Sequence, residues 1–124
     1  MANDVKLKEM VERMNLKNLT PDVDMAKKRI EVPDVNRPAL QLSGYFEHFD
    51  CERVQIIGYV EYTFLEKMAD DKKEEIYSTL LSYQIPCIIF CRNLPPEELF
   101  LKMAEKAGVP VFITEKKTSE FTSE

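Results

Sequence analysis

The chain has 124 residues, of which 44% are hydrophobic and 31% are charged, and its net charge is −5. This length suggests one domain with an ordinary apolar core. The acidic balance argues against nucleic acid or an anionic membrane as a partner, because both require a basic patch. The sequence has no apolar run of the roughly 18 residues that a membrane span needs, and its start does not resemble a leader. We therefore expect a cytoplasmic protein with reduced cysteines.

The first third of the chain predicts short elements that end at prolines. Apolar side chains within Asp4–Met14 recur at the spacing of one helix face, and Asp4 can cap that helix. A brief strand is expected at Leu16–Thr20, before Pro21. Ile30–Val32 predicts a second short strand, which is again followed by a proline.

The most distinctive stretch is Asp34–Phe46, which reads D-V-N-R-P-A-L-Q-L-S-G-Y-F. It predicts a short helix at Pro38–Ser43, because a proline is tolerated in the first helical turn. Asn36 is expected to accept hydrogen bonds from the free N–H groups at the helix start. Gly44 suits the position after a helix that needs a positive φ. The apolar side chains expected to dock this helix are Ala39, Leu42 and Phe46.

The rest of the chain alternates between strand and helix patterns. Strands are predicted at the apolar stretches Arg53–Ile57, Cys87–Cys91 and Val109–Thr114. Helical stripes fill the two intervals, with two helices in the first and one, starting at Pro95–Glu98, in the second. This alternation predicts an α/β fold with a parallel sheet and right-handed crossovers. We assign residues 1–114 to a single α/β domain and the polar residues 115–124 to the start of an interdomain linker.

Common patterns for nucleotide, metal and nucleophilic chemistry are not found in the sequence. The three glycines form no phosphate-binding loop. Cys87 and Cys91 lie too far apart on an extended strand to chelate a metal as a C-x-x-C turn does. His48 is the single histidine, and a packing or surface role is more common for such a residue than general-base catalysis. We therefore expect no catalytic residue and no metal site in this chain.

Two polar pairs are candidate ligand-binding residues. Arg92 and Asn93 follow a buried strand, at the sheet edge where ligands bind in parallel α/β folds. An arginine beside free helix N–H groups can hold a carboxylate or a phosphate. The simpler interpretation is a capping asparagine and a solvent-exposed arginine. Asn36 and Arg37 form the second pair, and its simpler interpretation is helix capping plus a salt bridge to a nearby acid.

Motifs in a fixed order carry a family resemblance across nearly the whole chain. They are Asp34–Phe46, Glu52–Gly58 (ERVQIIG), Pro86–Arg92 (PCIIFCR) and Ala107–Pro110 (AGVP). Together they resemble the N-terminal domain of HPr kinase/phosphorylase, a bacterial enzyme family that phosphorylates and dephosphorylates a serine of the phosphocarrier protein HPr. Ala39 departs from the family pattern, in which a glycine is expected at this position, and this small-residue exchange puts little in doubt.

The resemblance implies a three-layer α/β/α domain with a mostly parallel sheet of about four or five strands, similar to the Mur ligase N-terminal domain. It implies a non-catalytic, regulatory or interaction role in an enzyme that controls carbon catabolite repression and sugar uptake. The family's kinase domain, with its P-loop and its cofactors ATP and Mg²⁺, is expected outside this chain. HPr is the implied partner, and intact subunits of the family form homo-hexamers.

The alternative hypothesis is a stand-alone module of the same fold that binds a small ligand or a nucleotide near Arg92. An independent small enzyme is the least supported interpretation, because the sequence contains no convergent set of titratable groups.

Overall fold

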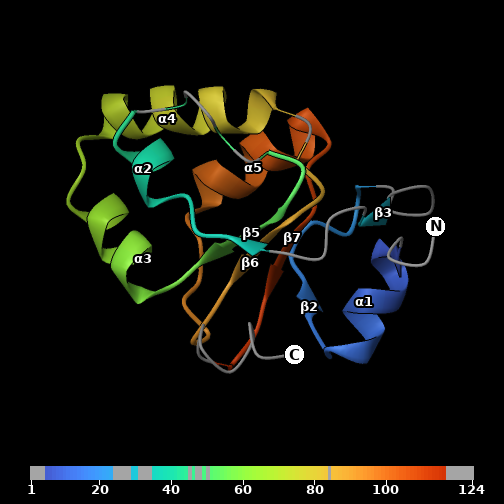
Figure 1. Ribbon diagram of the computed structural model, residues 1–124. Helices are drawn as coiled ribbons and strands as arrows, with labels where there is room; N and C mark the ends of the chain where they lie inside the picture. Colours follow the sequence, from blue (N-terminus) through green and yellow to red (C-terminus); the bar gives the residue numbers. More distant parts are fainter. Residues whose placement is uncertain are drawn as a thin grey trace.

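The computed structural model describes residues 5–23, 29–30, 35–44, 46, 49, 51–83 and 85–116 (Figure 1). Within these residues the chain forms a five-stranded sheet, a two-stranded sheet and five helices. The strands of the larger sheet are, in spatial order, β2 (Lys17–Asn18), β7 (Val111–Ile113), β6 (Ile88–Phe90), β5 (Val54–Ile57) and β4 (Val35–Asn36). Strands β4 to β7 are parallel, and β2 pairs antiparallel with β7.

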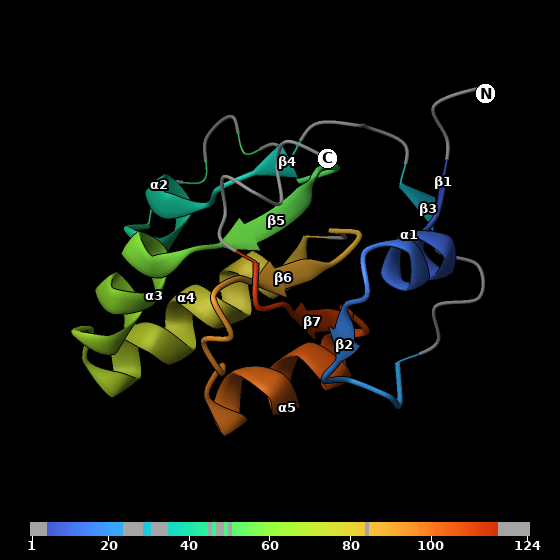
Figure 2. The same ribbon diagram turned by 90° about the horizontal axis from the view of Figure 1, so that it is seen from below.

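Helices lie on both faces of this sheet, which therefore forms the middle layer of three (Figure 2). The helices on one face are α2 (Ala39–Leu42), α3 (Tyr59–Glu66), α4 (Asp70–Ser82) and α5 (Glu98–Ala107). The other face is covered by α1 (Leu7–Arg13). This arrangement confirms the predicted α/β/α layers and the mostly parallel sheet.

The apolar strands supply both halves of the core because successive side chains point to opposite faces. Ile57 and Phe90 face α3, α4 and α5, whereas Ile56 and Ile89 face α1. Strands β5, β6 and β7 are buried along their whole length, as expected for a parallel sheet that is covered on both faces.

A second, smaller sheet lies beside α1 (Figure 1). It pairs β1 (Val5–Lys6) antiparallel with β3 (Arg29–Ile30). Because β1 leads directly into α1, Lys6 occupies the cap position of that helix. The predicted cap, Asp4, lies outside the described residues, and the structure has Lys6 at the cap position instead.

The predicted helices are confirmed, with their ends shifted by a few residues. Helix α2 occupies four residues within the predicted Pro38–Ser43, and Gly44 follows it with a φ of 104°. Helix α5 begins after two prolines and ends at Gly108, whose φ of 79° is the left-handed conformation common at helix ends. Among the described residues, no helix is long and apolar enough to cross a membrane.

Candidate functional site at the carboxyl edge of the sheet

The parallel strands bring polar residues from distant parts of the chain to one edge of the sheet. Strands β4, β5 and β6 end at Asn36, Ile57 and Phe90, which lie in neighbouring positions of the sheet. The residues that follow them therefore meet at the carboxyl edge. Two of the predicted site residues, Arg37 and Arg92, are among them.

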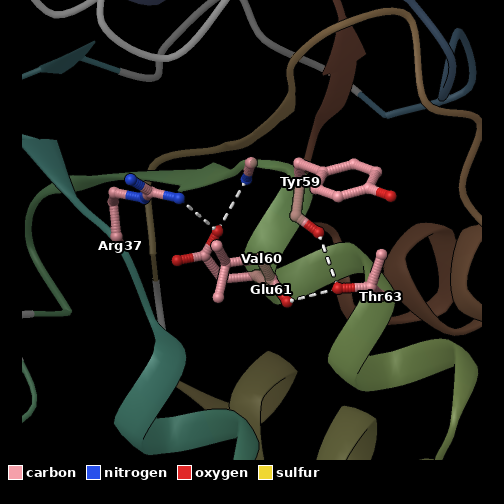
Figure 3. A network of polar contacts seen from close by, with 6 residues as sticks. Arg37, Tyr59, Val60, Glu61 and Thr63 are labelled. Carbon is pink, nitrogen blue, oxygen red and sulfur yellow. Dashed lines mark hydrogen bonds and ion pairs between the residues drawn. The ribbon is translucent and has the colours of Figure 1, made fainter.

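Arg37 is tied to the first turn of α3 through a buried carboxylate (Figure 3). Its Nη2 donates to Oε1 of Glu61 at 2.8 Å, and the backbone N–H of Gly58 donates to the same oxygen at 2.9 Å. The Glu61 side chain is only 3% exposed, while that of Arg37 is 42% exposed. Glu61 therefore serves as the local anion at this helix start, where the helix dipole favours a negative charge.

The expected salt bridge of Arg37 is thus present, and its acid comes from another element 24 residues along the chain. The expected helix-capping role of Asn36 is wrong. Asn36 belongs to strand β4, and its side-chain amide donates to Oε1 of Gln55 on β5 at 2.7 Å. These two residues are partners in the parallel register, so the hydrogen bond ties edge strand β4 to its neighbour. Asn36 also lies outside the cap position of α2, because that helix begins three residues later.

Arg92 and Asn93 form a tight turn at the end of the central strand β6. Both have left-handed backbones, with φ of 57° and 58°. Their N–H groups donate to the carbonyls of Lys116 and Thr114, at 2.9 and 2.8 Å, and so attach the turn to the exit of β7. Asn93 is not a helix cap, since α5 begins at Glu98. The left-handed conformation of a non-glycine residue costs on the order of 1 kcal/mol.

The Arg92 side chain is exposed, as the simpler interpretation expected. Its guanidinium carbon lies 6.0 Å from the centre of the Tyr59 ring, within the range of a cation–π contact. Tyr59 is itself 58% exposed, and Val60 and Phe64 of the same helix are 64% and 45% exposed. The carboxyl edge therefore presents a cation, an aromatic ring and an apolar helix face to solvent.

The chain path at this edge does not build a ligand crevice of the usual kind. Strands β4, β5, β6 and β7 follow one another in space in the order of the sequence, and their connecting helices α2 to α5 all pack on one face. In open α/β sheets the crevice forms where connections depart to opposite faces. The four predicted residues Asn36, Arg37, Arg92 and Asn93 thus lie along one edge, at the ends of strands β4 and β6, which are separated by β5. The described contacts favour positioning roles for Asn36 and Arg37, whereas the exposed Arg92 side chain contacts the ring of Tyr59.

A second polar cluster, which the sequence interpretation did not predict, lies between α4 and the start of α5. Nζ of Lys73 lies 3.1 Å from Oε2 of Glu97, and the hydroxyl of Tyr77 donates to Oε1 at 2.7 Å. The hydrogen bond from Tyr77 lowers the pKa of Glu97, an effect that partial burial opposes and Lys73 reinforces. Burial, with the hydrogen bond to Glu97, raises the pKa of Tyr77.

One signal in the sequence pointed to this cluster. Lys73 is in the same helical stripe as Ile76, Tyr77 and Leu80, and a lysine on such a stripe is buried with the apolar residues around it. Its partner Glu97 stands directly before the first residue of α5, where compensation of the helix dipole is the simpler role for an acid. No group of three metal-ligating side chains occurs in the described part of the chain.

Comparison with known proteins identifies the family. Residues 5–124 match the family described as HPr Serine kinase N terminus. The chain belongs to this family. Two relatives, each named HPr kinase/phosphorylase, come from Lachnoclostridium phytofermentans and Caldicellulosiruptor bescii. The first is 50% identical, over 97% of this chain and 39% of its own length. The second is 38% identical, over 91% of this chain and 36% of its own length. The chain thus spans less than two fifths of these relatives.

A solved structure shares the fold at low sequence identity. It is the crystal structure of the CBS and DRTGG domains of the regulatory region of Clostridium perfringens pyrophosphatase, in complex with its activator diadenosine tetraphosphate. The TM-score is 0.63 and the identity 15%, over 94% of this chain and 44% of that one. The family resemblance found in the sequence is confirmed. The structural neighbour is a regulatory region and not a Mur ligase, so it adds no support to the expected Mur likeness.

Proposed function

We propose that this chain is the N-terminal regulatory and interaction domain of an HPr kinase/phosphorylase, and that it carries none of the catalytic groups. The observation that carries this proposal is the match of residues 5–124 to a family described as an N terminus. Relatives with the enzyme's name extend well beyond the matched part, which covers only 36–39% of their length.

The described polar groups support a role without catalysis. Phosphoryl transfer needs a phosphate-binding backbone loop and acidic ligands for Mg²⁺. At the carboxyl edge the one acid in the described network, Glu61, is already bound by Arg37 and by the Gly58 N–H. The exposed groups of this edge instead include Tyr59 and Arg92, which are of residue types enriched in protein interfaces.

The chemistry of the whole enzyme is assigned to the part of the protein outside these 124 residues. In this proposal that part binds ATP and Mg²⁺, transfers a phosphoryl group to a serine of HPr and removes it again. The intact subunits assemble as hexamers in the cytoplasm of a bacterium and control carbon catabolite repression. The alternative of a stand-alone ligand-binding module has less support, because the relatives are named for the kinase and are much longer.

The structural neighbour agrees with a regulatory role, because it belongs to the regulatory region of another enzyme. At 15% identity this likeness concerns the fold alone. Its activator, diadenosine tetraphosphate, is therefore not assigned to this chain.

The proposal is tested by incubating the 124-residue chain with HPr, ATP and Mg²⁺ and measuring phosphoserine formation on HPr. We expect no turnover above a reaction without the chain, while the full-length relative from Lachnoclostridium phytofermentans, assayed in parallel, phosphorylates HPr. Measurable turnover by the chain itself would contradict the proposal.

A further inference from the structure

A cavity opens between α3, α4 and the start of α5, and its lining does not include Arg37, Glu61 or Arg92. Its volume is about 280 Å³. At the roughly 30 Å³ that a water occupies in the liquid, this is room for about nine waters or a ligand with a similar number of non-hydrogen atoms. The lining residues are Tyr62, Leu65, Glu66, Lys73, Tyr77, Phe90, Pro96, Glu97 and Phe100.

Four aromatic rings of the lining contact one another in a chain. Tyr62 meets Phe90, Phe90 meets Phe100, and Phe100 meets Tyr77, with ring centres 6.4, 5.6 and 4.9 Å apart and edge-to-face geometry. Phe90, Phe100 and Tyr77 are at most 3% exposed, so their positions are fixed by the core. A ligand in this cavity meets a rigid wall of apolar and aromatic surface, which suits the stem of a small organic molecule.

The charges of the cavity favour a cation. Lys73 is paired with Glu97, so the two together contribute no net charge. Glu66 adds a second carboxylate, which has no hydrogen-bond or ion-pair partner among the described residues. An anion would meet two carboxylates against one ammonium, whereas a cation meets an unmatched carboxylate beside aromatic faces.

The hydrogen-bonding groups of the lining also favour a cation. The hydroxyls of Tyr62 and Tyr77 donate to the Pro95 carbonyl and to Glu97, and so leave their oxygens as acceptors. The carboxylates of Glu66 and Glu97 only accept hydrogen bonds. Burial raises the pKa of Tyr62, and the negative charges of Glu66 and Glu97 raise it further against the opposing effect of Lys73. The electrostatic potential at this hydroxyl is therefore dominated by the acids.

We propose that this cavity binds a small organic cation, an amine or a guanidinium on an apolar stem of about four carbons, with its charged head near Glu66 and Glu97 and its stem against the aromatic wall. The cation comes either from a free metabolite or from an arginine or lysine side chain of a partner. This site is separate from the interaction surface of the proposed function and does not depend on it.

The test uses probes of matched shape and different charge on the 124-residue chain. n-Butylguanidinium, its uncharged analogue n-butylurea, and the anion pentanoate are each titrated while amide shifts are followed by two-dimensional NMR. We expect n-butylguanidinium to shift the amides of lining residues Tyr62, Glu66 and Phe100 in a saturable way, and n-butylurea to bind at least threefold more weakly. Equal binding of n-butylurea or pentanoate, or no saturable shift with any probe, would overturn the proposal.

A charge-neutralising variant with a matched control sharpens the test. Glu66→Gln should weaken n-butylguanidinium binding about threefold, because it removes the unmatched carboxylate without disturbing a described contact. Glu74→Gln makes the same change at an exposed residue of α4 outside the cavity and should leave the affinity unaltered. Identical affinity in wild type and Glu66→Gln would contradict the assigned position of the charged head.

The two sources of the cation are separated by a blocked tripeptide, acetyl-Gly-Arg-Gly-amide, in the same titration. Affinity equal to or tighter than that of n-butylguanidinium assigns the cavity to the side chain of a partner. Markedly weaker binding, with shifts from n-butylguanidinium retained, assigns it to a free small cation. Either result supports the proposed ligand chemistry.

Discussion

Two ion pairs of this domain, one at the carboxyl edge and one at the helical cavity, differ in which partner is buried. In the Arg37–Glu61 pair the carboxylate is 3% exposed and the cation 42% exposed. In the Lys73–Glu97 pair the cation is 10% exposed and the carboxylate 47% exposed. The buried partner is fixed by the fold, and the exposed partner decides which charge each site presents to solvent. The edge therefore presents donors, and the cavity presents acceptors.

The two ion pairs also differ in the hydrogen bonds that remain when the more exposed residue is removed. Glu61 keeps the backbone N–H of Gly58 as a donor if Arg37 is removed. Glu97 is the described partner of both the buried Lys73 ammonium and the buried Tyr77 hydroxyl. The free energy of unfolding should therefore depend more on Glu97 than on Arg37, although each is the more exposed member of its pair.

The largest effect is expected for Glu97→Ala, which leaves two buried polar groups without an acceptor. We predict a loss of about 2–3 kcal/mol in the free energy of unfolding, measured by urea denaturation. Adding Tyr77→Phe to this variant should recover part of the loss, because the unpaired hydroxyl is then removed. The control Glu98→Ala changes an exposed neighbour and should cost less than about 0.5 kcal/mol. Equal losses at the two positions would contradict the comparison.

A smaller effect is expected for Arg37→Ala at the carboxyl edge. Glu61 loses its charged partner but keeps the hydrogen bond from Gly58, so we predict a loss of about 1–2 kcal/mol in the same denaturation assay. Arg13→Ala, at an exposed residue of α1, serves as the matched control and should lie within about 0.5 kcal/mol of wild type. A loss larger than that of Glu97→Ala would reverse the proposed order of the two pairs.

Substitutions of Arg92 show whether its side chain contributes to the stability of the fold. Its left-handed backbone is strained in any residue except glycine, so Arg92→Gly should be about 1 kcal/mol more stable than Arg92→Ala. If Arg92→Gly also matches or exceeds the wild type in thermal unfolding, the arginine contributes little to stability. A wild type clearly more stable than Arg92→Gly would instead assign Arg92 a structural role.

The smallest effect is expected when the pH is lowered, because Glu97 is half exposed and solvent screens the contribution of its charge to the free energy of unfolding. The pKa of Glu97 in the folded chain lies below its ordinary value of 4.5, chiefly through the hydrogen bond from Tyr77. As the pH falls, the unfolded chain binds the proton first, and the stabilisation is lost below about pH 4.5. The stability difference between wild type and Glu97→Gln should therefore narrow between pH 6 and pH 3, and a constant difference would contradict this assignment.

The sequence predicted the elements whose signal is local. Strands β5, β6 and β7 come from apolar runs, and helix α5 is bounded by prolines and Gly108. Strand β4 was missed because two residues have no periodicity of their own, and its pairing depends on Gln55 on a neighbouring strand. Asn36 was consequently assigned to a helix start and not to a strand.

The sites were harder to predict because their contacts are long-range. Arg37 and Glu61 are 24 residues apart, and so are Lys73 and Glu97. A sequence shows that a lysine falls on an apolar helical stripe, but only the packing of α4 against α5 shows which acid it meets. The left-handed turn at Arg92 was equally hidden, since a positive φ is normally signalled by glycine and none is present there.

The central claim is that this domain regulates and interacts while the chemistry lies elsewhere in the enzyme. The most direct test removes the segment matching residues 5–124 from the Lachnoclostridium phytofermentans relative and measures the kcat of HPr phosphorylation. The account predicts that kcat stays within about threefold of the intact enzyme, a change of less than about 1 kcal/mol in the barrier. A fall of more than about a hundredfold in a truncated enzyme that remains folded and assembled would contradict it.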